Sequence, residues 1–169
     1  MNIQTYDSYP KSTILLSTLF SLATYLLGIF ILSIFGLWLV VPYVLYCLWL
    51  EFRLLQKSCV NCYYYGRSCG QGRGVICAWF FRQGKSENFN STPFSWLNVL
   101  PDFLVTLVPV LLGIIALLIN FSWLILLALL VLIILATAGN AIIRGKFLCP
   151  HCRQRELGCP AEQLFSSSK

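Results

Sequence analysis

Residues 12–50 read STILLSTLFSLATYLLGIFILSIFGLWLVVPYVLYCLWL, 39 positions without one charged side chain. As a single α-helix this stretch would measure about 58 Å at about 1.5 Å per residue, roughly twice the hydrocarbon thickness of a bilayer. We therefore expect it to fold back as a hairpin, with spans over 12–33 and 37–55. The sequence Ser33-Ile-Phe-Gly36 supplies the turn. A hairpin of this kind predicts an integral membrane protein.

A second charge-free stretch of 41 residues covers 103–143, and it divides at Asn120-Phe-Ser122 into spans over 96–119 and 121–143. The whole chain has a mean hydropathy of +0.76 and only 11% charged residues, whereas about a quarter of the residues of a soluble domain are charged. The predicted fold class is an all-α integral membrane protein. Its four transmembrane helices form two hairpins, and a small cysteine-rich metal-binding module completes it.

Four segments follow from this pattern. They are an N-terminal segment with the first hairpin (1–55), a cysteine-rich loop (56–95), the second hairpin (96–143) and a cysteine-rich tail (144–169).

The positive charges are distributed asymmetrically between the two sides of the predicted spans. All twelve lysines and arginines lie before the first span, between Glu51 and Asn98, or in the tail, and the two outer turns have none. Basic residues collect on the cytoplasmic side of membrane proteins. We therefore predict a multi-pass protein of the plasma (inner) membrane with both termini cytoplasmic. By the same reasoning, the net charge of +6 reflects the membrane topology and contact with membrane lipid. It does not favour a nucleic-acid partner, because the basic residues are spread along loops.

The loop and the tail share a cysteine motif. Cys59-Val-Asn-Cys62 and Cys149-Pro-His-Cys152 are each followed six residues later by another cysteine, Cys69 and Cys159, in the pattern C-x2-C-x6-C. Zinc prefers four tetrahedral thiolate or imidazole ligands, and a reducing cytosol favours metal over disulfides. The predicted ligands to one or two zinc ions are Cys59, Cys62, Cys69, Cys77, Cys149, Cys152, Cys159 and His151.

Spacing leaves two partitions of these ligands open. In the first, the two C-x2-C pairs hold one ion together, as in a zinc ribbon, and the remaining cysteines with His151 form a second site. In the second, the four loop cysteines bind one ion, and the tail cysteines with His151 bind another. Cys149-Pro-His-Cys152 resembles the C-P-x-C knuckle of zinc ribbons and rubredoxins, although Tyr63 and Arg153 stand where these knuckles have glycine.

Two further resemblances concern layout or a short motif. Four spans with a cysteine-rich loop after the second are similar to the layout of protein S-acyltransferases, whose Asp-His-His-Cys motif is absent here. The tetrapeptide at 149–152 is similar to the active-site motif of periplasmic thiol oxidases, which work in a thioredoxin fold. Only 17 residues follow Cys152, too few for that fold.

The sequence favours a non-enzymatic role. His151 is the only histidine, and the six acidic residues are scattered over termini and loops. The first hypothesis is a cytosolic structural zinc site in a scaffold or interaction module, with an iron–sulfur cluster as the less favoured cofactor. The alternatives are a membrane-bound redox protein and a protein that handles a soft metal ion. Oligomeric state is left open.

Two features of the loop bear on its partners. The apolar patch 75–81 is too short to span, so it either docks on the bilayer surface or packs on the cysteine module. The glycine-rich run 66–74 could cradle a phosphate, but it favours tight turns around a metal. We expect Tyr63, Tyr64, Tyr65 and Trp79 to present an aromatic, basic surface to a protein partner or to anionic lipid.

Overall fold

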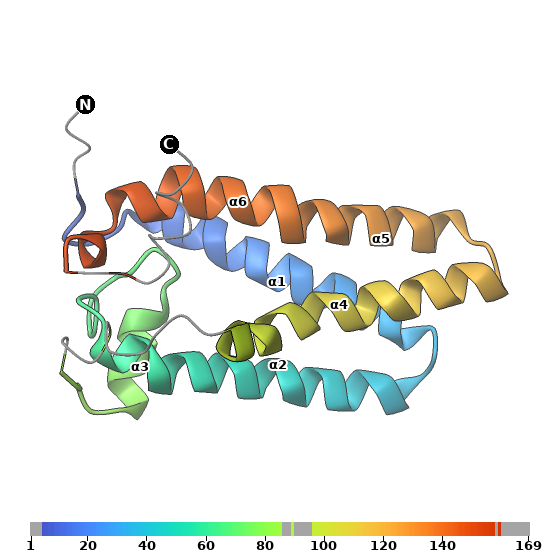
Figure 1. Ribbon diagram of the computed structural model, residues 1–169, viewed down its shortest axis with the longest axis horizontal. Coiled ribbons are helices and arrows are strands. Elements are labelled where there is room, and N and C mark those ends of the chain that lie inside the picture. The colour runs from blue at the N-terminus through green and yellow to red at the C-terminus, as the bar shows by residue number, and fades with distance from the viewer. Residues whose placement is uncertain (1–4, 86–88, 90–95, 158, 160–169) are drawn as a thin grey trace. The chain divides into compact units, whose positions relative to one another are not determined.

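The computed structural model describes residues 5–85, 89, 96–157 and 159, and the side chains of 96–99 are excluded. Its long helices are α1 (Lys11–Ser33), α2 (Leu37–Lys57) and α4 (Trp96–Ile119), with a fourth that begins at Trp123 (Figure 1). All four are long and apolar enough to cross a membrane. The prediction of an all-α chain with four helices that could span a membrane is confirmed.

The turn of the first hairpin lies where the sequence places it. Helix α1 ends at Ser33, and the Gly36 backbone N–H donates to the Ser33 carbonyl at 3.1 Å. Gly36 has a φ of 104°, a conformation that is readily adopted only by glycine. The turn therefore needs this residue type as well as its position.

The fourth helix is longer than the predicted span 121–143. It consists of α5 (Trp123–Ile134), a π-helical turn (Leu135–Gly139), the short α6 (Asn140–Ile142) and a second π-helical turn (Ile143–Leu148). Its start is displaced because Ser122 has an extended backbone and acts as the N-cap. The span was predicted to end at 143 because Arg144 and Lys146 limit the apolar stretch. The helix continues past this point because neither arginine nor lysine stops a helix.

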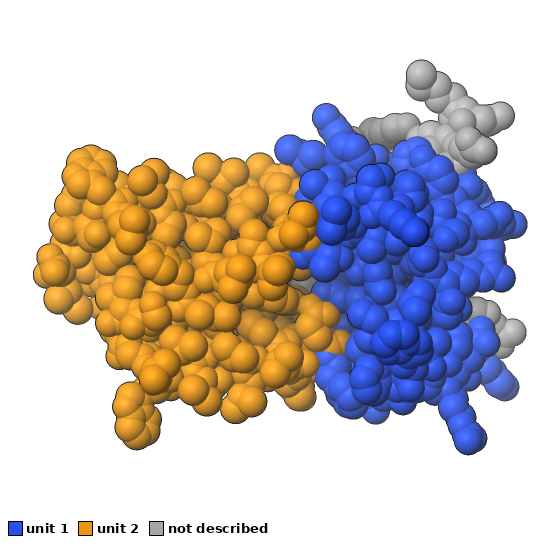
Figure 2. All heavy atoms as spheres, turned by 180° about the vertical axis from the view of Figure 1, so that it is seen from behind, with its two compact units in different colours: residues 1–18, 52–94, 141–169 blue, residues 19–51, 95–140 orange. Residues whose placement is uncertain are grey.

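The chain divides into two compact units (Figure 2). Unit 1 contains residues 1–18, 52–94 and 141–169, and so collects the N-terminal segment, the cysteine-rich loop and the cysteine-rich tail. Unit 2 contains residues 19–51 and 95–140, which make up most of the four long helices.

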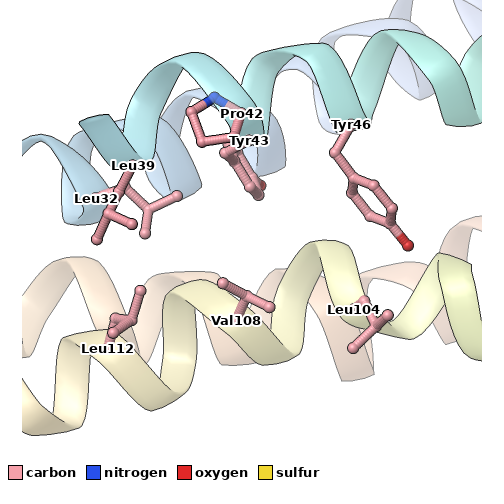
Figure 3. A pocket seen from close by; sticks show the side chains of 8 residues that line it. All are labelled: Leu32, Leu39, Pro42, Tyr43, Tyr46, Leu104, Val108 and Leu112. Carbon is pink, nitrogen blue, oxygen red and sulfur yellow. The ribbon is translucent and has the colours of Figure 1, made fainter. Parts of the chain in front are cut away.

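In unit 2 a tyrosine compensates for a proline in the middle of helix α4. Pro109 has no backbone N–H, so the Val105 carbonyl one turn earlier lacks its helical partner. The Tyr43 hydroxyl of α2 donates to that carbonyl at 3.0 Å. A neighbouring hydroxyl, that of Tyr46, donates to the Pro101 carbonyl at 2.9 Å. The two tyrosines line an apolar pocket of about 240 Å³ between α2 and α4 (Figure 3).

Tyr43→Phe is expected to lower the free energy of unfolding by about 1 kcal/mol, because the buried Val105 carbonyl then has no donor. The loss should shrink in a Pro109→Ala background, where the new backbone N–H can bond to Val105. Unfolding of the parent, the two single variants and the double variant in mixed detergent micelles measures this coupling. Equal losses in both backgrounds would contradict the assigned role of the hydroxyl.

Candidate functional site

The two C-x2-C motifs adopt the same local backbone conformation in unit 1. Cys59–Asn61 and Cys149–His151 each form one 3-10 turn, and each follows directly from a long helix. In both turns the backbone N–H of the second cysteine donates to the carbonyl of the first at 3.3 Å. The second cysteines have similar dihedral angles, φ −82° and ψ 148° for Cys62 and φ −82° and ψ 118° for Cys152. The sequence repeat is thus also a repeat of structure.

The repeated geometry continues beyond each motif. The Tyr65 N–H donates to the Cys62 carbonyl at 3.0 Å, and the Arg155 N–H donates to the Cys152 carbonyl at 3.1 Å. Two residues further on, the Arg67 N–H donates to the Tyr64 carbonyl at 3.0 Å, and the Leu157 N–H donates to the Gln154 carbonyl at 3.2 Å. Equivalent positions lie 90 residues apart throughout, although their residue types differ.

Reciprocal hydrogen bonds lock the two motifs together. The Tyr63 backbone N–H donates to Oε1 of Gln154 at 2.7 Å, and the Arg153 backbone N–H donates to the Tyr64 hydroxyl at 3.0 Å. Tyr63 is equivalent to Arg153, and Tyr64 is equivalent to Gln154. Each motif therefore contributes one side-chain acceptor to the other, which is the contact pattern of a two-fold relation. The two acceptor side chains, Tyr64 and Gln154, are each about 2% exposed.

Residues before α1 form a third part of the module, which the spacing of the cysteines did not indicate. The Tyr6 N–H donates to the His151 carbonyl at 3.0 Å, and the Tyr9 N–H donates to the Ser68 carbonyl at 2.9 Å. The Tyr9 hydroxyl donates to the Leu148 carbonyl at 2.6 Å. These contacts join the N-terminal segment to both cysteine segments. The only signal in the sequence is the presence of two tyrosines in a short polar stretch.

An ion pair at the surface reinforces the same junction. The Arg153 guanidinium binds the Asp7 carboxylate, which also accepts from the Tyr63 hydroxyl at 3.0 Å. The Tyr63 hydrogen bond, followed by the Arg153 one, lowers the pKa of Asp7. Both charged groups are exposed, so the pair contributes orientation more than stability.

The thiols of the module are partly or fully buried and interact with one another. Burial raises the pKa of the Cys62 thiol to about 11, and the thiols of Cys152, Cys69 and Cys159 raise it further. Burial also raises the pKa of Cys152, with contributions from Cys159 and Cys149. Thiolates in such surroundings require a compensating positive charge, which a bound metal ion would provide.

Backbone donors point at several of these sulfurs. The Tyr64 N–H lowers the pKa of Cys62, and the equivalent Gln154 N–H lowers that of Cys152. The Gly74 N–H lies 3.3 Å from Sγ of Cys69. Such donors favour the thiolate form, and they are part of the outer shell that tunes cysteine-ligated metals. The donor set therefore fits a soft metal ion in residue type.

The electrostatic neighbours of the thiols divide into two groups. The Cys59 thiol interacts with those of Cys69, Cys77 and Cys62, and the Cys77 thiol interacts with that of Cys69. The tail thiols form the other group, and Cys62 stands between the two through its interactions with Cys152 and Cys159.

Among the described residues, no three histidine, cysteine or acidic side chains are arranged as a metal-binding group. All seven predicted cysteine ligands belong to unit 1, but they do not converge on one point. His151 stacks on the Tyr6 ring, with ring centroids 4.8 Å apart. The prediction of a metal site thus stays a prediction, with its candidate residues gathered in one unit.

The glycine-rich run forms tight turns, as expected from its composition. Gly66 and Gly72 have φ values of 70° and 73°. A Cβ on Gly74 would overlap the backbone oxygens of Tyr64 and Arg67. The Arg73 guanidinium donates to Oε1 of Gln71 at 2.6 Å. These glycines allow close approach of the backbone around the first C-x2-C turn.

No family model matches the chain, and no curated protein or solved structure shows significant similarity to it. The class of protein is therefore inferred from the structure of the described residues alone. They form four helices able to cross a membrane and a unit in which seven cysteines gather.

Proposed function

We propose that this chain is a multi-pass membrane protein in which structural zinc ties the cysteine-rich loop to the cysteine-rich tail. The single observation that carries the proposal is the pair of equivalent C-x2-C turns. They are joined by reciprocal hydrogen bonds and have backbone N–H groups directed at their sulfurs. The resulting module serves as a scaffold or interaction surface on the cytosolic side.

The interactions among the Cys59, Cys69 and Cys77 thiols favour the second partition of ligands, whereas the Cys62 thiol interacts most strongly with that of Cys152, as in the first partition. In the second partition Cys59, Cys62, Cys69 and Cys77 hold one ion. The tail cysteines Cys149, Cys152 and Cys159 hold the other, with His151 as the fourth ligand. In the alternative, both C-x2-C pairs share one ion, and Cys69, the fully buried Cys77 and Cys159 hold a second ion together with His151.

A saturated set of thiolate ligands favours a structural over a catalytic ion, since catalytic zinc keeps a position open for water. The chain lacks the C-x2-C-x2-C-x3-C run that many iron–sulfur proteins carry, which favours zinc over an iron–sulfur cluster. When bound, zinc would hold the cysteines as thiolates and link segments far apart in the sequence. The backbone donors of Tyr64, Gln154 and Gly74 would stabilise the thiolates.

The charge distribution supports the cytosolic location of this module. In the described part of unit 1 the carboxylates are Asp7 and Glu156, whereas basic residues occur in every segment of the unit. An excess of lysine and arginine beside the helices marks the cytoplasmic side of a membrane.

Metal analysis of the purified full-length protein tests the proposal. We expect about two zinc ions per chain and no visible absorption, because zinc thiolates are colourless. Chelation should expose the thiols of unit 1 to a thiol reagent and should leave the long helices intact by circular dichroism. A metal-free preparation whose eight thiols all react would overturn the proposal, and a coloured protein containing iron would replace zinc by a cluster.

A further inference from the structure

Helix α3 (Arg73–Phe80) has one buried face and one exposed apolar face. Gly74 and Cys77 are buried on the inner face. On the outer face Ile76, Trp79 and Phe80 are 43%, 78% and 69% exposed. Their spacing of three and four residues places them side by side on one side of the helix.

The exposure of this face does not result from a loosely held helix. The Gly66 N–H donates to the Gly74 carbonyl at 3.0 Å near the start of α3, and the Tyr65 hydroxyl donates to the Phe81 carbonyl at 2.6 Å just after its end. In the middle, Sγ of Cys77 lies 3.5 Å from the Leu55 carbonyl of α2. The inner face is therefore held at both ends and at its centre, and the orientation of the outer face is set.

The apolar face continues onto the end of helix α2. The Phe81 ring packs against the Phe52 ring with centroids 5.1 Å apart, and Phe52 is itself 52% exposed. Phe52 lies at the loop-side end of a helix that is long and apolar enough to cross a membrane. Aromatic side chains at such an end lie at the level of the lipid headgroups. The exposed face of α3 is thus continuous with a surface that meets the bilayer interface.

Basic residues lie close in sequence to the residues of this aromatic surface. Arg73 begins α3, and Arg82 and Lys85 follow it in exposed or partly exposed positions, while Lys57 ends α2. No aspartate or glutamate occurs between Phe52 and Lys85. An apolar face bordered by lysine and arginine matches an anionic membrane surface, into which the rings insert while the cations reach the headgroups.

We infer that α3 is an interfacial helix that docks the cysteine module onto an anionic lipid leaflet through Ile76, Trp79 and Phe80. This inference goes beyond the proposed metal site. It does not require metal, since the hydrogen bonds at the two ends of α3 come from the backbone and from tyrosine. The helix would hold the module against the membrane surface beside α2, and the basic residues would select anionic headgroups.

The test uses the full-length protein in nanodiscs of phosphatidylcholine, with and without phosphatidylglycerol. Subtracting the fluorescence of Trp79→Phe from that of the parent isolates the signal of Trp79. Acrylamide quenching of this signal is expected to be about threefold weaker in the anionic discs than in detergent, because the ring is in the bilayer interface. Phospholipids brominated on the acyl chain should quench the same signal.

The variant Ile76→Ser with Phe80→Ser keeps Trp79 but removes the rest of the apolar face, and it should restore acrylamide quenching. The matched control is Leu157→Ser, because Leu157 is similarly exposed at 54% in the tail of the same unit. It should change nothing. Replacement of Arg82 and Lys85 by glutamate should abolish the preference for anionic discs.

Each other outcome decides against the inference. If Trp79 is equally open to acrylamide in all discs and in detergent, α3 does not dock. If it is shielded but not quenched by brominated lipid, another protein surface covers it. Equal lipid quenching in neutral and anionic discs overturns the choice of an anionic lipid. Zinc content measured on the same samples separates this result from the proposed metal site, because either can fail while the other holds.

Discussion

Cys77→Ser is expected to reduce the zinc content from about two ions per chain to about one. Cys77 is completely buried, and its thiol interacts electrostatically with the thiols of Cys69 and Cys59. Serine removes one ligand of four. Apparent binding free energies of structural zinc are about 10–16 kcal/mol, so loss of the ion should also loosen the first C-x2-C turn. Elemental analysis together with limited proteolysis of the loop measures both effects.

The tail offers the complementary variant. Cys159→Ser should release the second ion and leave the first, whereas the combined variant should bind none. The matched control is Cys47→Ser, because Cys47 is a buried cysteine of unit 2 that packs with Leu50 and Val105. It should keep both ions. Retention of one ion by the combined variant would instead favour a single ion shared by the two C-x2-C pairs, with Cys77 and Cys159 together in the second site.

Gly74→Ala is expected to destabilise unit 1 by about 3 kcal/mol. The added Cβ would overlap the backbone oxygens of Tyr64 and Arg67, which cannot move without disturbing the first C-x2-C turn. The Tyr64 N–H and the Gly74 N–H also point at sulfurs, so displacement of this backbone should weaken metal binding. A loss of this size corresponds to about a hundredfold larger population of opened molecules.

The rate at which the buried Cys77 thiol reacts with a small alkylating reagent measures this opening. The rate should rise by about a hundredfold in Gly74→Ala relative to the parent. Gly145→Ala is the matched control in the same unit, because a Cβ there meets nothing within 4 Å. Its reaction rate should stay at the parental value. Equal rates in the two alanine variants would show that the backbone around Gly74 can adjust.

The four helices were predictable from the sequence because a bilayer leaves the backbone few choices. Backbone groups in hydrocarbon must bond within their own segment, so a long charge-free stretch becomes helix. The turn at Gly36 also follows from residue type, because its positive φ suits glycine. The end of the fourth helix was less predictable. A charge marks the limit of the hydrocarbon, but the helix continues through Arg144 and Lys146 into the second cysteine motif.

The candidate site was predictable in its residues but not in its contacts. Fixed spacing identifies C-x2-C turns, since the backbone conformation of such a turn is local. The locking side chains could not be found by residue type, because tyrosine and glutamine occupy the equivalent positions 64 and 154. A backbone N–H can donate to any oxygen acceptor, so only the position is repeated. Tyr6 and Tyr9 were missed because their partners lie far along the chain.

The sequence by itself determined the four helices that could span a membrane, the turns between them and the set of cysteines, because each depends on local composition or short spacing. The tertiary structure alone decided how these parts meet. It joined the two cysteine motifs through Tyr64 and Gln154, brought the N-terminal segment onto both, and gave α3 one buried and one exposed face. These contacts link residues tens of positions apart, and no local pattern specifies which distant donor will meet which acceptor.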